Sequence, residues 1–487
     1  MSFKVNGSRM CPSSQVGYHF HIVAHACRRI LLAISVVTFV GLGSVLPGRL
    51  HAQEPAETME QRIERLELQV KELHAALALS PDSAALLEVR RQIEAITREL
   101  EELRLGEEVV ARADTTAFGL GPAASKVYRA DQGVSIGGYG EFRYQNFASE
   151  REDGEPSGRT DEFDALRAVF YVGYKFNDRF LFNSEIEFEH AGTSGGGSAS
   201  VEFAYIDWRF RGARGSTGAR GGLLLVPMGF INEMHEPPTY LGSRRPETER
   251  RIIPTTWREN GFGLFGVAAD FDWRVYVVSG LDGSGFTAEG LRGGRQKGSR
   301  ALAEDFAAVG RLDWRGVQGL VLSTSAYFGG SGQGLEDPLN PGGTIGAATL
   351  IVEGHVGYKA RGLDLRGLFT LATVDDVASL NVANGLTGSE SIGERLTGWY
   401  VQAGYDVLRG ARTDVQLLPY VRFESVNTQD AVPDGFSADP ANDLSLLTLG
   451  AQVLPIPQIV LKTDYTFQST GADSGVDQWN VSLGYLF

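Results

Sequence analysis

The feature that most limits how this chain can fold is a long succession of segments in which apolar and other residues alternate. The final segment shows it best, since Trp479, Val481, Leu483, Tyr485 and Phe487 occupy every second position. A period of two is typical of a β-strand that has one apolar face. The sequence from about residue 134 onward therefore predicts strands and not helices.

Sixteen segments have this texture, and the connections between them alternate in length. Asn177-Asp178 and Pro455-Ile456 are tight turns, whereas SEREDGEPSGR and GGSGQGLEDPLNPGGT are longer, polar and Gly-rich. Short turns at one rim and long loops at the other are the pattern of a transmembrane β-barrel, in which neighbouring strands satisfy the backbone hydrogen bonds. The segments lie at about 134–148, 161–176, 179–190, 199–211, 218–227, 257–270, 272–281, 304–315, 318–330, 348–360, 362–375, 394–408, 413–427, 443–454, 457–470 and 475–487.

We therefore predict an all-β transmembrane barrel of 16 antiparallel strands over residues 134–487. A soluble β-sandwich is the alternative, but it explains neither the number of segments nor the aromatic end. Phe487, in phase with the preceding apolar residues, resembles the assembly signal of bacterial outer-membrane barrels. That resemblance implies outer-membrane lipid and the outer-membrane assembly machinery as partners.

The alternation also assigns the faces of the strands. In the third segment Phe180, Phe182, Ile186 and Phe188 are expected to face lipid, which leaves the alternate residues, among them Glu185, in the lumen. Because charges on the lipid face are costly, we expect a polar, water-filled interior instead of a packed core. Lumen-wall candidates, interrupted by acidic residues, are Arg143, Arg167, Arg209, Arg274, Arg311 and Arg422.

The N-terminus has the order of a secretory signal peptide. Arg28-Arg29 precede the apolar run 30–46, and a cleavage site follows at Ala52, so residues 1–52 are predicted to be removed. An anchoring transmembrane helix is the alternative. Both cysteines, Cys11 and Cys27, and five basic residues lie in this leader, and the mature chain keeps 40 basic against 60 acidic residues, a net charge of −20. That charge argues against a nucleic-acid partner.

Residues 53–106 carry apolar residues at alternating spacings of three and four, with charged residues between them. This heptad pattern predicts a helical coiled-coil stem in the periplasm. The β-branched residues at its core positions favour self-association of more than two helices. A hairpin folded within one chain at Ser80-Pro81 is the alternative. Residues 107–133, rich in Ala, Gly, Thr and Ser, are predicted to be a linker.

Two short motifs match those of a dinucleotide-binding site and of a hydrolase nucleophile, but neither lies at the turn from a strand to a helix that its function requires. Gly261 to Gly266 match G-x-G-x-x-G inside a predicted strand, where glycine relieves crowding, and Gly192 to Gly196 match G-x-S-x-G in a flexible loop. The four histidines of the mature chain lie in separate elements. We therefore expect no enzyme activity, catalytic residue, cofactor or metal. An outer-membrane hydrolase using Ser194 is the less favoured alternative.

An acidic chain nevertheless concentrates arginines in one stretch, RRPETERRIIPTTWREN, residues 244–260. It belongs to the longest connection, 228–256, which is the best candidate for a loop folded into the barrel. Guanidinium groups stay protonated and form paired hydrogen bonds to phosphate or carboxylate. Either these arginines line a constriction, or they pair with Glu247, Glu249 or Glu259 and hold the loop. The pore-constriction candidates are Arg244, Arg245, Arg250, Arg251 and Arg258.

The blocks LLLVPMGF and RRPETERRIIPTTWRENGFGLFG, together with the stem and the terminal strand, resemble the phosphate-selective porin O and P family. The resemblance covers essentially the whole mature chain, and the block 223–266 is its specific part. It implies a homotrimeric outer-membrane channel of sixteen strands in which inward arginines and lysines favour anions, phosphate among them. The barrel of this chain has few lysines. The expected function is diffusion of small hydrophilic solutes, with a possible preference for phosphate-like or carboxylate anions; a receptor or adhesin barrel is the alternative.

Overall fold

A computed structural model describes residues 117–130, 132–210 and 217–487, together with Arg65 and Leu68. The chain divides into two units, residues 1–103 and 104–487, and the barrel belongs to the second. Apart from Arg65 and Leu68, the predicted signal peptide 1–52 and stem 53–106 lie outside the described residues. Their structure is therefore untested.

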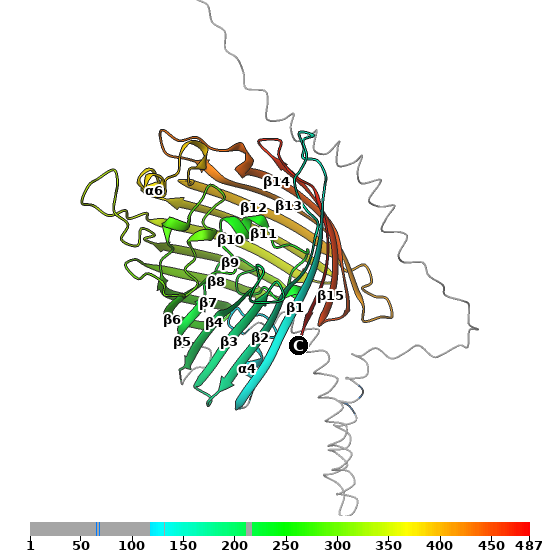
Figure 1. Ribbon diagram of the computed structural model, residues 1–487. Helices are drawn as coiled ribbons and strands as arrows, with labels where there is room; N and C mark the ends of the chain where they lie inside the picture. The colour runs from blue at the N-terminus through cyan, green and yellow to red at the C-terminus, as the bar shows by residue number, and fades with distance from the viewer. Residues whose placement is uncertain (1–64, 66–67, 69–116, 131, 211–216) are drawn as a thin grey trace, which may run out of the picture. The chain divides into compact units, whose positions relative to one another are not determined.

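The second unit is a closed barrel of 16 antiparallel strands in which each strand pairs with its neighbours in sequence and β1 pairs with β16 (Figure 1). This confirms the predicted number and topology. The strands are β1 Gly133–Phe147, β2 Glu162–Lys175, β3 Phe180–Glu189, β4 Ser198–Arg209, β5 Thr217–Leu225, β6 Arg258–Ala268, β7 Phe271–Ser279, β8 Phe306–Val317, β9 Leu320–Gly329, β10 Thr349–Ala360, β11 Leu363–Val374, β12 Arg395–Tyr405, β13 Gln416–Ala431, β14 Asp443–Ile456, β15 Ile459–Thr470 and β16 Gln478–Leu486.

The seam between the first and last strands is completed by the terminal residue. The N–H of Phe487 donates to the carbonyl of Gly138 at 2.9 Å, and the N–H of Gly138 donates to the carbonyl of Phe487 at 2.9 Å. Between β1 and β16 the pairing continues from Tyr139–Leu486 to Phe147–Gln478. The sheet therefore has no free edge at this position, as the backbone of a membrane-spanning sheet requires.

The connections differ at the two rims as expected. One rim has short turns, among them 269–270, 318–319 and 457–458, and the other has loops of up to 32 residues. We call the β5–β6 connection, residues 226–257, loop L3, and the β7–β8 connection, residues 280–305, loop L4. Loop L3 contains a 3-10 turn, η3 (Pro237–Thr239), and a short helix, α5 (Glu247–Arg251). Short α-helices also lie before β1, α4 (Lys126–Arg129), and after β11, α6 (Val377–Ala383).

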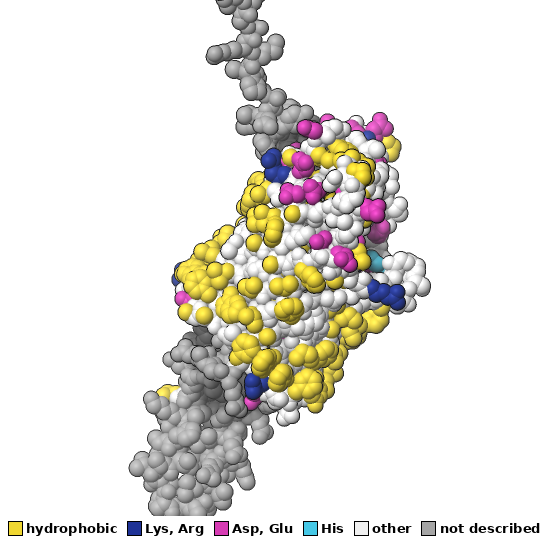
Figure 2. Space-filling model, turned by 90° about the vertical axis from the view of Figure 1, so that its left-hand side faces the viewer, with side chains coloured by type: hydrophobic (Ala, Val, Ile, Leu, Met, Phe, Trp, Pro, Cys, Tyr) yellow, Lys and Arg dark blue, Asp and Glu magenta, His cyan; other side chains and the backbone are white. Residues whose placement is uncertain are grey.

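The two faces of the wall have opposite chemistry. In β3, Phe180 and Phe188 are exposed on the outside, while Asn183, Glu185 and Glu187 are buried inside the barrel. Figure 2 shows apolar side chains spread over the middle and lower part of one outer face, with acidic side chains gathered toward its upper end. The predicted face assignment is confirmed for this strand. Within the described residues, no helix is long and apolar enough to cross a membrane.

The interior differs from the water-filled lumen that we expected. Inward aromatic residues such as Tyr139, Phe203 and Tyr276 are fully buried, and they belong to a hydrophobic cluster that also includes residues of L3 and of segment 117–130. The inner face of the wall carries many polar side chains that water could solvate. Loop L3 and segment 117–130 fold against this face and remove much of it from solvent. Part of the predicted linker 107–133, residues 117–130, is thus an ordered part of the barrel contents.

The glycines of the G-x-G-x-x-G motif have a structural role inside β6. A Cβ on Gly261 would lie 2.4 Å from the carbonyl oxygen of Val277, and one on Gly263 would lie 2.1 Å from that of Val275. Glycine is therefore needed where β7 and its inward side chains approach β6 closely, which confirms that these residues relieve crowding.

Candidate functional site

Loop L3 is folded into the barrel and is closed at its own base by one side chain. The buried amide of Asn232 donates to the carbonyls of Val226, at 2.6 Å, and Trp257, at 2.9 Å, and its oxygen accepts from the N–H of Trp257 at 2.6 Å. These three bonds join the first and last residues of the loop. The loop therefore leaves and re-enters the wall at one place, and its middle is free to cross the lumen.

The middle of L3 is attached to the wall on several sides. His235 Nε2 lies 3.0 Å from Glu185 Oε1 on β3, and the Tyr400 hydroxyl on β12 donates to Glu249 at 2.7 Å. The N–H of Ser243 donates to Asp464 on β15 at 2.6 Å. Because these strands lie far apart around the barrel, L3 spans its interior, as the predicted constriction loop should.

Three of the predicted constriction arginines converge on one carboxylate. Glu247, the first residue of α5, lies 3.0 Å from Arg244, 2.6 Å from Arg250 and 3.0 Å from Arg251. Burial alone would raise the pKa of Glu247, but these three guanidinium groups outweigh it and hold the pKa well below its usual range. One negative charge is thus shared by three positive ones, and the cluster keeps a net positive charge.

The other two candidates of this stretch occupy different positions. Arg245 is partly buried, and its NH2 atom has no hydrogen-bond partner among the described residues. Arg258 is the first residue of β6, is buried, and pairs with Glu202 at 2.7 Å, so it is separate from the α5 cluster. Glu249 and Glu259, which were expected as arginine partners, instead accept hydrogen bonds from Tyr400 and from the indole of Trp257.

Most of the predicted lumen-wall arginines face inward and are held by carboxylates. Arg274 and Arg311 both bind Asp313, the latter at 2.8 Å, and Arg422 binds Glu424 at 2.9 Å. Arg167 lies 3.4 Å from Glu141 and 3.3 Å from Glu187. Arg143 and Arg209 also lie on the inward face of β1 and β4 and are partly buried. Ion pairs within a strand and between neighbouring strands thus reduce the positive charge that these arginines present to the lumen.

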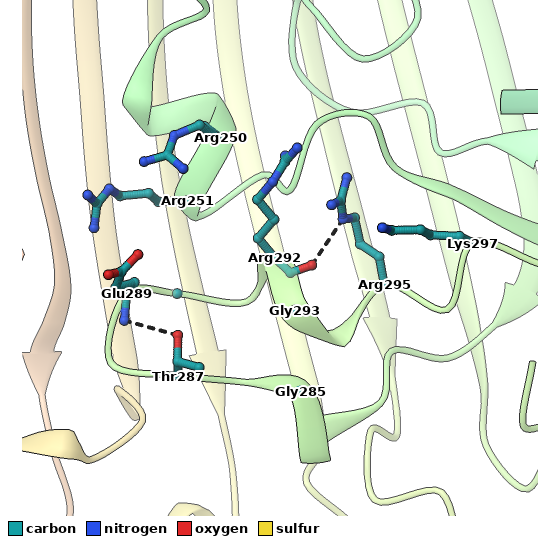
Figure 3. A pocket seen from close by; sticks show the side chains of 10 residues that line it. Arg250, Arg251, Gly285, Thr287, Glu289, Arg292, Gly293, Arg295 and Lys297 are labelled. Atoms are coloured by element: carbon teal, nitrogen blue, oxygen red, sulfur yellow. Dashed lines mark hydrogen bonds between the residues drawn. The ribbon is translucent and has the colours of Figure 1, made fainter. Parts of the chain in front are cut away.

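A second group of cations lies opposite α5, in L4. Arg250 and Arg251 of L3 face Arg292, Arg295 and Lys297 of L4 across a cavity of about 340 Å³. Figure 3 shows these five side chains side by side. Among the residues lining the cavity, Glu289 is the single acidic one. Within the described part of the chain, none of the three L4 cations has a carboxylate oxygen within ion-pair distance.

One of the L4 cations, Arg295, is held in place by backbone groups. Arg295 donates to the carbonyls of Arg292, Thr255 and Thr256, at 3.0, 3.0 and 2.8 Å. The NH1 atom of Arg292 is buried with no hydrogen-bond partner among the described residues. Burial, with Arg295, Arg245 and Arg250 nearby, lowers the pKa of Arg292 to about 9, and burial with Arg258 lowers that of Arg295 to about 10. Both stay charged at neutral pH, and an anion in the cavity would relieve their mutual repulsion.

The L4 cations were not singled out from the sequence, although a signal was present. Residues 291–300, LRGGRQKGSR, contain four basic and no acidic residues. That imbalance marks a second positive stretch, but nothing in the sequence pairs it with α5. Ser194, the hydrolase candidate, is exposed in the loop after β3, where the ring of His190 binds Asp164 at 2.7 Å. Among the described residues, no group of three or more His, Cys, Asp or Glu side chains is placed to hold a metal.

Comparison with known proteins gives one relative over most of the chain. A protein of Aquifex aeolicus (strain VF5), described as an uncharacterized protein, is 35% identical over 396 residues, which cover 79% of this chain and 87% of the relative. The two proteins belong to one family. No protein-family model matches the sequence.

Several solved structures of outer-membrane proteins are similar to the barrel at low identity. Salmonella typhi OmpF is 11% identical, with a TM-score of 0.47 over 73% of this chain and 98% of that one. The anion-selective porin from Comamonas acidovorans is 12% identical, with a TM-score of 0.44 over 73% and 99%. Vibrio cholerae OmpT, in its trimer form, is 11% identical, with a TM-score of 0.45 over 74% and 100%.

Proposed function

We propose that this chain is an outer-membrane channel through which small hydrophilic solutes diffuse. A closed sixteen-strand sheet with an apolar outer face and a polar inner face supports a place in the outer membrane. The apolar face would contact lipid, and the polar face would contact water or polar parts of the chain. Transport by diffusion needs no cofactor and no catalytic residue, and we propose neither. Assembly as a homotrimer with the stem in the periplasm, and membership of the phosphate-selective porin O and P family, belong to the same proposal.

We further propose that the channel prefers anions such as phosphate or carboxylates. The observation that carries this proposal is the cavity between L3 and L4, in which five cations face one carboxylate. In a partly desolvated passage such a charge excess raises the local concentration of anions and repels cations. Arg250 and Arg251 supply one side, as the sequence indicated, and Arg292, Arg295 and Lys297 supply the other.

The test is single-channel recording of the purified full-length protein in planar bilayers. Conductance supports a channel, and the reversal potential in a potassium chloride gradient measures the ratio of anion to cation permeability. We expect that ratio to exceed one. Absence of conductance from a folded, inserted barrel would instead favour the receptor or adhesin alternative. A cation preference would refute the role of the L3–L4 cavity while leaving the channel intact.

A further inference from the structure

Segment 117–130, which precedes the barrel, lies inside it and not alongside it. Leu120, Ala123, Ala124, Ser125 and Val127 are all buried. Helix α4 at the end of this segment contacts β1, β2 and β3 near the rim of short turns (Figure 1). The ring of Phe118 lies edge-on against Phe265 of β6, with 4.8 Å between centroids. Inside the barrel, the segment therefore contacts the wall from β1 to β6.

Polar groups of the wall fix the segment at defined points. Tyr128 donates to Asp207 at 2.7 Å and accepts from Arg220 at 2.8 Å. The amide of Asn183 donates to the carbonyl of Ala124 at 3.0 Å, and Lys175 donates to that of Ala130 at 2.7 Å. Inward polar residues of β2 to β5, which would otherwise face water, are thus used to bind this piece of chain.

The segment also contacts the tip of L3 through a single carboxylate. Glu236 accepts hydrogen bonds from the N–H groups of Ala123, at 3.0 Å, and Ala124, at 3.1 Å. Two glycines make the approach possible, since a Cβ on Gly121 would lie 2.5 Å from the Glu236 carboxyl carbon and one on Gly119 would lie 2.1 Å from Arg274 NH1. The segment is therefore fitted to L3 and to the wall together.

We propose that segment 117–130 is a plug that closes the barrel from the short-turn side, and that solutes pass only when it moves out. The inference rests on the proposed channel function. The contacts that hold the plug are hydrogen bonds and side-chain packing, so it can leave without breaking a covalent bond. Because the plug is joined directly to the chain that precedes it, a pull on residues 53–106 would be transmitted to it.

A disulfide tests this directly. A Cβ on Gly173 would lie 2.7 Å from Val127 Cβ, so the double variant Val127→Cys/Gly173→Cys needs a shift of about 1 Å to reach the separation usual for a disulfide. Both native cysteines, Cys11 and Cys27, lie in the predicted leader. In planar bilayers the oxidised variant should remain at its lowest conductance, and a reductant should restore the openings of the unmodified protein.

A plug-free variant gives the opposite result. Replacing 117–130 by Gly/Ser residues of equal length should raise single-channel conductance about threefold or more, because it removes one of the two pieces of chain that fill the lumen and leaves only L3 to narrow an otherwise aqueous channel. The matched control is the same replacement of residues 148–161, an exposed loop of equal length at the other rim, which should leave conductance unchanged. Heat-modifiable mobility in gels verifies that each barrel is folded.

The outcomes separate the two proposals. Equal conductance of the unmodified, oxidised and plug-free proteins would overturn the plug and leave the channel in place. No conductance from any folded variant, the plug-free one included, would overturn the channel function and with it the plug.

Discussion

The barrel wall and loop L4 both present arginines to the same interior, but in opposite electrostatic settings. On the wall, Arg274 and Arg311 share Asp313, and Arg422 has Glu424. In L4, Arg295 donates to backbone carbonyls, and the NH1 atom of Arg292 has no hydrogen-bond partner among the described residues. Both lie beside other cations. Arginines paired with carboxylates thus belong to the structure of the wall, whereas the L4 arginines keep an excess of positive charge, which is the property that the proposed anion preference uses. Helix α5, with three arginines on one glutamate, stands between the two.

The largest effect is expected from breaking a wall pair. Asp313→Asn would leave the buried guanidinium groups of Arg274 and Arg311 with less compensation, and removing one partner of a buried ion pair costs about 3–5 kcal/mol. Urea unfolding in lipid vesicles measures the loss. The control, Asp153→Asn, breaks the exposed pair with Arg151 and should change the stability far less, because solvent screens that pair. Equal losses would remove the distinction between structural wall pairs and surface pairs.

The next effect concerns selectivity. The triple variant Arg292→Ala/Arg295→Ala/Lys297→Ala removes one side of the cavity, and the anion-to-cation permeability ratio should fall about tenfold. Reversal potentials in a salt gradient give the ratio. Arg151→Ala/Arg159→Ala/Arg395→Ala removes the same charge from exposed or half-exposed positions outside the cavity and should change the ratio little. If both triple variants had the same ratio, net charge and not the cavity would set selectivity.

A smaller change in the opposite direction is expected from Glu247→Gln. Without this carboxylate, Arg244, Arg250 and Arg251 lose their shared partner, and the permeability ratio should rise about two- to threefold. Glu155→Gln, in an exposed loop, is the control for the loss of one charge. An unchanged permeability ratio would place the three arginines away from the path of the solute, and they would then be structural, like the paired arginines of the wall.

The smallest effect is expected from pH, through Glu236, a carboxylate that forms no ion pair with an arginine or lysine among the described residues. Burial raises the pKa of Glu236 to about 7, and its two N–H donors oppose that shift; His235, Glu185 and Tyr171 are the other titratable groups facing it. A released, hydrated Glu236 would titrate near its ordinary value of about 4.3. The plugged state therefore binds more protons between these two values, and its stability falls as pH rises through about 7. Conductance should rise modestly from pH 5 to pH 8, and Glu236→Gln should abolish that change.

The fold was predictable because its signals are local. Period-two alternation placed the first strand at 134–148, against 133–147 in the structure, and the rule of short and long connections gave the closed order. The thirteenth strand, expected at 413–427, runs from Gln416 to Ala431. Its last residues, Thr428 and Gln429 among them, are polar and therefore look like loop, yet they are buried against other loops.

The contents of the barrel were less predictable because they depend on which segments meet. Inward aromatic residues, including Tyr139, Phe203 and Tyr276, were a sign that something packs against the wall, but alternation alone does not say what. The position of the α5 arginines and the pairing with Glu247 were both recoverable from residues 244–251. Loop L4 was missed because it is distant in sequence, and its cations join the site only after two loops fold toward each other.

Asn232 has a consequence for how such a protein can vary. Its three hydrogen bonds, together with the bond from the N–H of Val226 to the carbonyl of Trp257 at 3.0 Å, close L3 into a ring, so the geometry at the base of the loop is set by residues at the base and not by those within the ring. The 24 residues between Asn232 and Trp257 can then change in length or composition while the adjoining strands keep their register. Loop L3 is in that sense an exchangeable insert, and exchanging the residues inside the ring while keeping Val226, Asn232 and Trp257 is a practical way to change the contents of the barrel without changing its wall.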